Sequence, residues 1–442
     1  MRGATTLCTL GTALLFLSPA INAFQPSAKE SPSVVRFDLQ RRVVDNPVNR
    51  DRKLLRKRGK KHYAKDNLYN LGTYYAVDIA LGTPPQTLTV QIDTGTSDLW
   101  VNAVNTTFSD EMRTPGARGG TYDPDASSTA RYLSSEFRIK YADGVSATGD
   151  FVKDTLAIGG KKAKNVQFGV GYQSSANEGV LGLGFLANEI QVAEDKKDPY
   201  PNVPFALKEA GVIACACYTL WLNDVESEHG VILFGGIDVE KYHGTLEPVS
   251  LIPNKHGVLE EFNVKLASLE LQTENDIKEI GSQYLPVAAI LDTGTSVTYL
   301  PDLVVDSINE ELGVVDENVE LNVIKCSLKD ADIILTFYFD GATIKVPVKE
   351  LIIDMPPGDE GEPITFDDGE PMCFFGIAPA GNGRSILGLT FLRSAYILYD
   401  LESTDVLMAQ AKTGATGEKI TAIHSTPQPN NPTRRRTLSP SS

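Results

Sequence analysis

A duplicated five-residue segment constrains this 442-residue chain more than any other feature of its sequence. Residues 93–97 read Asp-Thr-Gly-Thr-Ser, and residues 292–296 repeat them 199 positions later, each copy directly after an apolar run. A second motif follows each copy, Val-Leu-Gly at 180–182 and Ile-Leu-Gly at 386–388. Chance rarely places two motifs twice in the same order at similar spacing, so the repeat predicts two homologous lobes.

The sequence between the motifs has the character of β-structure. Short alternating or β-branched runs such as 74–81 and 151–158 are separated by Gly, Pro, Asn and Asp. Helical patterns are few, at 204–210 and at 301–312, where Pro301 suits the first helical position. We therefore predict a mainly β, bilobal fold. Its two β-barrel-like lobes are related by a pseudo-two-fold axis, with a few short helices and a cleft between them.

The net charge argues against nucleic acid as a partner, and its distribution differs between the two ends of the chain. The net charge of −16 argues against nucleic acid as the main partner, because phosphate binding needs a basic face. Residues 1–58 carry a net charge of +7 and residues 59–442 a net charge of −23. The opposite charges suggest that the basic N-terminal segment interacts with the acidic remainder of the chain.

The N-terminal 23 residues have the pattern of a secretory signal peptide. Arg2 supplies the positive region, residues 7–17 are mostly apolar, and Ala20 or Ala23 suits cleavage. The apolar run is shorter than the about 20 residues of a membrane span. Residues 425–442 form a Pro/Ser-rich tail, expected to be disordered, without the hydrophobic end of a lipid-anchor signal. We expect a secreted, extracellular protein with no membrane anchor.

The next segment predicts a propeptide. Residues 24–61 are basic, poor in apolar periodicity and contain Arg-Lys-Arg at 56–58. In a secreted chain this run resembles a maturation site for a furin- or kexin-type protease, and the alternative is a solvated basic linker. We assign 24–58 to a basic propeptide, 59–240 to the N-terminal lobe and 241–424 to the C-terminal lobe.

Four cysteines lie beyond the signal peptide, and secretion permits disulfides. Cys215 and Cys217 lie in an apolar run, 212–222, that resembles a buried strand. There their Cα atoms would be about 6.5–7 Å apart, at or beyond the usual limit for a bridge. Cys326–Cys373 is the better pair. No His or second Cys pair stands at a recognised spacing from Cys-Ala-Cys, so we expect no metal site.

The duplicated motif supplies a pair of carboxyl groups. One Asp-Thr-Gly alone is weak evidence, since Asp and Gly are ordinary turn residues. If the lobes are related by a pseudo-two-fold axis, Asp93 and Asp292 can meet at it. Two carboxylates in contact share a proton, because both cannot ionise cheaply. One can then take a proton from water while the other gives one to a carbonyl oxygen.

The neighbouring residues fit this interpretation. The glycine of each motif permits close backbone approach and can present its N–H to a carboxylate. The first threonine of each motif can join the two turns across the axis, and the second can bind the outer carboxylate oxygen. The residues assigned to this support are Thr94, Gly95, Thr96, Thr293, Gly294 and Thr295.

Residues 93–101, Asp-Thr-Gly-Thr-Ser-Asp-Leu-Trp-Val, with the second motif copy, resemble the pepsin family of aspartic endopeptidases. The resemblance runs from about residue 74 to 423, and 373–377 and 391–396 are most similar to secreted fungal candidapepsins and yapsins. It implies a pepsin-like fold with Asp93 and Asp292 as the catalytic pair. It also implies an extended peptide substrate paired like an added strand, and no cofactor. The five histidines show no metal-site or triad pattern.

Tyr141-Ala142-Asp143-Gly144 resembles the flap hairpin of that family. By this resemblance Tyr141 is the flap tyrosine, its hydroxyl lies near Trp100, and Asp143 and Gly144 bind the substrate backbone. The alternative for Tyr141 is an ordinary strand aromatic. Trp100 is interpreted as core or flap support, and Asp98 as a turn or structural residue.

The sequence departs from the family pattern in two places. Leu389 stands where relatives commonly carry Asp. No Cys lies between Trp100 and Tyr141, so the first lobe lacks a disulfide loop. The corresponding stretch, 102–130, is expected to be mobile. Asn105 lies there in a glycosylation sequon, so we expect a glycan at Asn105.

Taken together, these patterns predict a secreted, monomeric aspartic endopeptidase, made as a zymogen, that hydrolyses internal peptide bonds at acidic pH. Its partners are peptide or protein substrates and its own propeptide, an inhibitor that acidification loosens as carboxylates become protonated. The first alternative is a catalytically inactive pepsin-fold binding or inhibitor protein. Loss of a dyad Asp, its Gly or the flap Tyr would favour that alternative, and none is lost. A second alternative, a carbohydrate-binding β protein, is supported only by the predicted β-strands and the scattered aromatic residues.

Overall fold

The structure is a computed structural model that describes residues 33–44, 72–109, 117–141, 144–315, 322–355 and 362–423. The predicted signal peptide, the maturation site at 56–58 and the tail at 425–442 lie outside these residues. The described chain is mainly β, with a few short helices, as the sequence predicts. No helix in these ranges combines the length and apolar character needed to cross a membrane.

Short strands follow one another along most of the described chain. The strands up to residue 250 are β1 (Val35–Val44), β2 (Gly72–Leu81), β3 (Gln86–Asp93), β4 (Leu99–Phe108), β5 (Arg131–Lys140), β6 (Ser146–Ile158), β7 (Lys161–Ser174), β8 (Gly179–Gly182), β9 (Cys217–Trp221), β10 (His229–Phe234), β11 (Gly236–Asp238) and β12 (Tyr242–Ser250). The later strands are β13 (Asn263–Gln272), β14 (Ile277–Ile280), β15 (Val287–Leu291), β16 (Thr298–Leu300), β17 (Val323–Lys325), β18 (Ile334–Phe339), β19 (Thr343–Pro347), β20 (Ile352–Asp354), β21 (Met372–Phe375), β22 (Ile377–Pro379), β23 (Ser385–Leu387), β24 (Ala395–Asp400), β25 (Asp405–Ala411) and β26 (Ile420–Ala422). The helices are α2 (Ile190–Ala193), α3 (Val203–Glu209), α4 (Asp302–Leu312) and α5 (Leu389–Leu392), with 3-10 turns η1 (Leu186–Asn188), η2 (Ser282–Tyr284), η3 (Cys326–Asp330) and η4 (Val348–Leu351).

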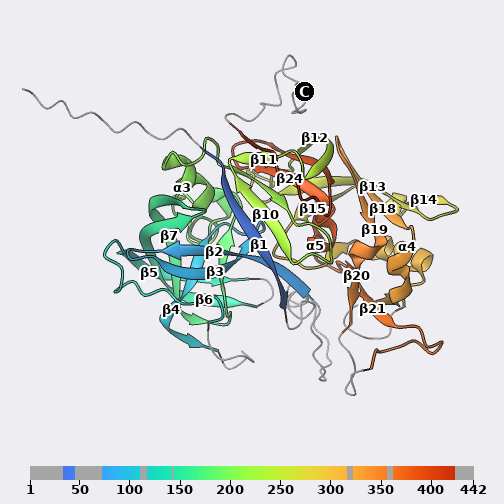
Figure 1. Cartoon of the computed structure of the whole chain (residues 1–442), viewed down its shortest axis with the longest axis horizontal. Coiled ribbons are helices and arrows are strands. Elements are labelled where there is room, and N and C mark those ends of the chain that lie inside the picture. The colour runs from blue at the N-terminus through green and yellow to red at the C-terminus, as the bar shows by residue number, and fades with distance from the viewer. Residues whose placement is uncertain are drawn as a thin grey trace, which may run out of the picture. The chain divides into compact units, whose positions relative to one another are not determined.

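Two large sheets contain most of these strands (Figure 1). Among the described residues, the larger sheet has thirteen strands in the order β12-β25-β24-β9-β10-β1-β2-β3-β8-β4-β7-β6-β5. The second has eight, in the order β19-β18-β13-β15-β23-β16-β22 with β14 beside β13. Strands from the C-terminal part of the chain, β12, β24 and β25, therefore complete the sheet that carries the first motif.

The two motif copies lie in equivalent strand arrangements. Strand β3 ends at Asp93 and runs parallel to β8, which pairs antiparallel with β4. Strand β15 ends one residue before Asp292 and runs parallel to β23, which pairs antiparallel with β16. In each case the Val/Ile-Leu-Gly motif supplies the middle strand. In both copies the Val/Ile-Leu-Gly strand pairs with the strand that leads to the Asp-Thr-Gly loop. This shared pairing explains why the two motifs recur in the same order.

Strand β1 corrects one sequence prediction. Val35, Phe37 and Leu39 alternate toward the core and are buried, so the description of residues 24–61 as poor in apolar periodicity is wrong here. The charged and polar residues between them conceal a two-residue period, which is the period of a half-buried strand. Strand β1 pairs antiparallel with β10 on one side and with β2 on the other (Figure 1).

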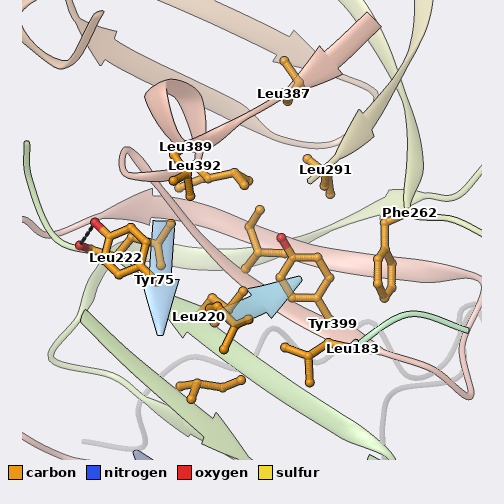
Figure 2. Packing of buried hydrophobic residues seen from close by; sticks show 14 of the residues in the cluster. Tyr75, Leu183, Leu220, Leu222, Phe262, Leu291, Leu387, Leu389, Leu392 and Tyr399 are labelled. Atoms are coloured by element: carbon orange, nitrogen blue, oxygen red, sulfur yellow. Dashed lines mark hydrogen bonds between the residues drawn. The ribbon is translucent and has the colours of Figure 1, made fainter. Parts of the chain in front are cut away.

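The core continues from one half of the chain to the other. One cluster of buried residues contains Tyr75 of β2 and Tyr399 of β24 together with Leu291 of β15 and Leu389 of α5 (Figure 2). The Tyr75 hydroxyl donates to the carbonyl of Leu222 at 2.8 Å (Figure 2), so its polar end is satisfied inside the core. The strands that carry both motifs therefore pack into one common core.

Three local expectations need correction. Cys215 and Cys217 form a disulfide with their Cα atoms 5.2 Å apart, because strand β9 begins only at Cys217 and the preceding residues form bends. Pro301 caps α4 from outside the helix and does not occupy its first turn. The loop predicted over 102–130 is shorter, since β4 runs on to Phe108 and buried Tyr122 pairs with its backbone.

Candidate active site

Each motif aspartate accepts the same two hydrogen bonds from its own loop. The Gly95 N–H donates to Asp93 Oδ1 at 2.8 Å, and the Thr96 hydroxyl donates to Asp93 Oδ2 at 2.8 Å. In the second loop the Gly294 N–H donates to Asp292 Oδ1 at 2.8 Å. The Thr295 hydroxyl donates to Asp292 Oδ2 at 2.6 Å. Both carboxyl groups are therefore held in one orientation by donors of the same type.

Each carboxyl group lies against the glycine of the other loop. A Cβ atom built on Gly95 would lie 2.8 Å from Asp292 Oδ1, and one built on Gly294 would lie 2.7 Å from Asp93 Oδ1. Any side chain at either glycine would collide with the opposite carboxyl group. The structure thus brings Asp93 and Asp292 together. Asp93 is 6 % exposed and Asp292 is half-buried.

The first threonine of each motif joins the two loops below the carboxyl groups. The Thr94 hydroxyl donates to the carbonyl of Leu291 at 2.9 Å and accepts from the Thr293 N–H at 3.0 Å. In return the Thr293 hydroxyl donates to the carbonyl of Ile92 at 3.3 Å and accepts from the Thr94 N–H at 3.0 Å. These reciprocal bonds relate the two loops as a pseudo-two-fold axis would.

The predicted flap residues lie at the end of the β5–β6 hairpin. The last registered pair of that hairpin joins Lys140 to Ser146, and Gly144 adopts φ +91° in the turn between the strands. Trp100 Nε1 donates to the Tyr141 hydroxyl at 2.7 Å, which is the contact that the resemblance implies. Asp143, also assigned to the flap, lies outside the described residues.

The structure also places the remaining sequence-derived residues. Cys326 and Cys373 form a disulfide with Cα atoms 5.1 Å apart. Asn105 is exposed on β4. Leu389 is fully buried at the start of α5, and its N–H donates to the carbonyl of Thr295.

Sequence reasoning missed residues that support the first loop. The side-chain amide of Asn188 in η1 donates to the carbonyl of Gly95 at 3.0 Å. Asp98 accepts from the Tyr200 hydroxyl at 2.7 Å, and burial raises its pKa to about 6 despite that hydrogen bond. Asn188 and Tyr200 lie about 90 and 100 residues beyond the loop that they support. No local spacing in the sequence could have indicated either contact.

Comparison with known proteins gives this arrangement a family. The chain matches the family model described as eukaryotic aspartyl protease over residues 74–411. The "Probable aspartic-type endopeptidase OPSB" of Arthroderma benhamiae is 41% identical over 426 residues, 96% of this chain and 85% of that protein. Candidapepsin of Candida tropicalis is 33% identical over 391 residues, 87% of this chain and 90% of that protein. Yapsin-3 of Saccharomyces cerevisiae is 32% identical over 435 residues, 95% of this chain and 80% of that protein. The chain therefore belongs to the eukaryotic aspartyl protease family and is an aspartic-type endopeptidase.

Proposed function

We propose that Asp93 and Asp292 are the catalytic pair of this endopeptidase. The observation that supports this most is the symmetry of their surroundings, in which each carboxyl group accepts two hydrogen bonds from its own loop and lies against the glycine of the other. Adjacent carboxyl groups in one site favour a state with a single shared proton. Acidic medium maintains that state, so we propose that activity is greatest at acidic pH.

The shared proton makes direct attack by water possible. The ionised carboxylate takes a proton from a water molecule, whose oxygen bonds to the peptide carbonyl carbon. The protonated carboxyl group gives its proton to the carbonyl oxygen. Proton transfer to the amide nitrogen then accompanies C–N cleavage, so no acyl-enzyme and no cofactor are needed. An extended substrate would lie under the hairpin that carries Tyr141, Asp143 and Gly144 and pair with it like an added strand.

We further propose that the chain is a zymogen cut after Arg58. Strand β1, which lies in the assigned propeptide, is held mainly by apolar burial, at about 1.5–3 kcal/mol for each side chain such as Phe37. Its Arg36 pairs with Asp38 and Glu418 on the surface, where an ion pair contributes only about 0–1 kcal/mol. Acidification alone would therefore not release β1. Protonation of carboxylates would instead weaken their attraction to the basic propeptide residues that follow β1.

Cleavage and inhibition can be tested separately. Replacing all three basic residues at 56–58 by Ala should leave the chain uncut and inactive in acid. The isolated 24–58 peptide should inhibit the matured enzyme at neutral pH and lose that effect on acidification. Activity of the uncut chain, or a peptide that does not inhibit, would refute the zymogen proposal.

The remaining parts of the proposal concern where the enzyme acts. We propose secretion to the extracellular space directed by residues 1–23, a monomeric state, and a glycan on Asn105. The exposed side chain of Asn105 on β4 supports the last point, since a glycan can be attached only to an asparagine that is accessible. Mass spectrometry of the secreted protein before and after enzymatic removal of N-linked glycans tests the modification.

The decisive experiment measures acid proteolysis of an unstructured protein substrate. The matured enzyme should cleave internal bonds at acidic pH, and Asp93→Asn and Asp292→Asn should each abolish cleavage. Asp125→Asn changes an exposed carboxyl group elsewhere in the first lobe and serves as the matched control. Full activity in either dyad variant would overturn the proposal. An inert but folded wild-type enzyme would favour the inactive binding protein instead.

A further inference from the structure

A second pair of carboxyl groups lies buried outside the dyad, at Asp98 and Glu189. Asp98 follows the first motif and is 2 % exposed, and Glu189 directly precedes α2 and is fully buried. Both bind the buried residue Tyr200. Its hydroxyl donates to Asp98 Oδ1 at 2.7 Å, and its N–H donates to Glu189 Oε2 at 2.9 Å. The Ile190 N–H donates to Asp98 Oδ2 at 2.9 Å.

Among the residues that the structure describes, no positive charge compensates this carboxyl pair. Within the described ranges, no Lys, Arg or His forms a hydrogen bond or an ion pair with Asp98 or Glu189. Arg138 of β5 binds acidic residues that follow α2, and Lys197 binds Glu136.

Glu189 is the less satisfied member of the pair. Its Oε1 atom is buried and has no hydrogen-bond partner among the described residues. A buried carboxylate without a cation is strongly disfavoured. Burial raises the pKa of Glu189 to about 9, opposed by the Tyr200 N–H and assisted by the charge of Asp98. Burial likewise raises the pKa of Asp98 to about 6. A neutral Glu189 needs no cation, and this agrees with the lack of one among the described residues around it.

Tyr200 connects the carboxyl pair to the flap hairpin. Its ring contacts Phe151 of β6, with ring centroids 6.2 Å apart. Phe151 contacts Phe137 of β5 at 5.4 Å, and Phe137 contacts Trp100 at 6.3 Å. Trp100 in turn donates a hydrogen bond to the Tyr141 hydroxyl. The two carboxyl groups thus lie at the base of the aromatic packing that ends at Tyr141.

We propose that Glu189 is protonated in the folded protein, and that ionisation of Glu189 and Asp98 as the pH rises destabilises the first lobe beneath the flap hairpin. The pair would then set an upper pH limit on the folded enzyme. Because each group binds its proton more tightly in the folded chain than in the unfolded one, the stability that it contributes is fully present in acid. For Glu189 that contribution is lost as the pH rises toward 9. This inference concerns folding and does not depend on the assignment of the catalytic pair.

The test counts the protons released when the full chain unfolds. Unfolding in urea is measured between pH 5 and pH 8.5, and one proton held only by the folded state raises the unfolding equilibrium constant about tenfold per pH unit. Glu189→Gln mimics the protonated form, since its amide oxygen can accept from the Tyr200 N–H while its NH₂ replaces the unpartnered oxygen. This variant should lower the proton count by about one and leave stability at pH 5 close to that of the wild type.

A matched control and a second readout keep the test decisive. Glu194→Gln makes the same chemical change at a side chain that is 54% exposed near α2, and it should leave the proton count unchanged. A wild-type count in Glu189→Gln would overturn the proposal. Should that variant fail to fold, the wild type decides alone: a stability that does not fall between pH 6.5 and pH 8.5 would equally overturn it.

Discussion

The two motif loops are alike at the carboxyl groups and differ a few residues later. Asp93 and Asp292 accept equivalent hydrogen bonds, and the threonines that follow them exchange equivalent bonds across the axis. At the sixth position the first loop has Asp98 and the second has Val297, and both are buried.

The difference separates two demands on the site. Sharing one proton between two carboxyl groups requires matched surroundings, so the residues that touch them are the same in both loops. Beyond them each loop adapts to its own neighbours. Asp98 meets the Tyr200 hydroxyl, whereas Val297 joins an apolar cluster with Tyr299 and Phe374. Four predictions test where the equivalence ends.

The largest effect is expected at the dyad itself. Asp93→Asn and Asp292→Asn should each lower kcat/KM by about a thousandfold or more, because either change removes the proton exchange on which water activation depends. The two losses should agree within a factor of ten if the carboxyl groups are equivalent. Steady-state kinetics on a peptide substrate measure this, and thermal unfolding checks that both variants remain folded. A loss confined to one variant would break the symmetry.

Placing the first loop's sixth residue in the second loop should destabilise the protein strongly. Val297→Asp places a carboxyl group where an apolar cluster surrounds it, and an uncompensated buried charge costs about 3 kcal/mol or more. The loss, measured by urea unfolding, should be larger at pH 7 than at pH 4, where the introduced group can be protonated. Val297→Asn supplies the uncharged control. Equal losses for both variants at pH 7 would contradict the argument from charge.

Removing one threonine hydroxyl should weaken the connection between the loops. Thr94→Ala leaves the Thr293 N–H and the Leu291 carbonyl unpaired, at a cost of about 1–3 kcal/mol. Thr293→Ala should cost less, since its bond to Ile92 is longer, at 3.3 Å. Urea unfolding measures both, with Thr→Ser at the same positions as controls. A larger loss for Thr293→Ala would contradict this ranking.

The smallest effect is expected at the flap, which lies in the β5–β6 hairpin and has no part in the symmetry of the two motif loops. Tyr141→Phe removes the acceptor of the Trp100 indole N–H, and one hydrogen bond of about 1 kcal/mol corresponds to a five- to tenfold lower kcat/KM. Tyr132→Phe changes an exposed tyrosine on the same hairpin and should leave the kinetics unchanged. If Tyr141→Phe matches that control, the hydrogen bond does not position the flap.

What the sequence could predict depended on distance along the chain. The repeated motifs predicted two equivalent strand arrangements, because a motif and its supporting strand are read from consecutive residues. Asn188 and Glu189 escaped prediction because an amide and an acid near a short helix resemble ordinary surface residues. Only the folded chain shows that Glu189 is fully buried and that Asn188 reaches Gly95.

Local chain direction was the second limit. The separation expected for Cys215 and Cys217 assumed an extended strand, and the bends before β9 shorten it to 5.2 Å. In β1 the opposite error occurred, since the charged residues Arg36 and Asp38 hid the regular alternation of Val35, Phe37 and Leu39, which are buried. Composition averaged over a segment conceals an alternation that only a residue-by-residue reading can recover.

The position of β1 has a consequence for anyone who produces this enzyme. A chain shortened to begin at residue 59 would lack β1, and the edges of β10 and β2 that pair with it would be left open. Two open edges in the middle of a sheet invite association with other molecules. The segment before residue 59 thus contributes a strand to the folded sheet in addition to its proposed role as a propeptide. Recombinant production should retain it until the rest of the chain has folded.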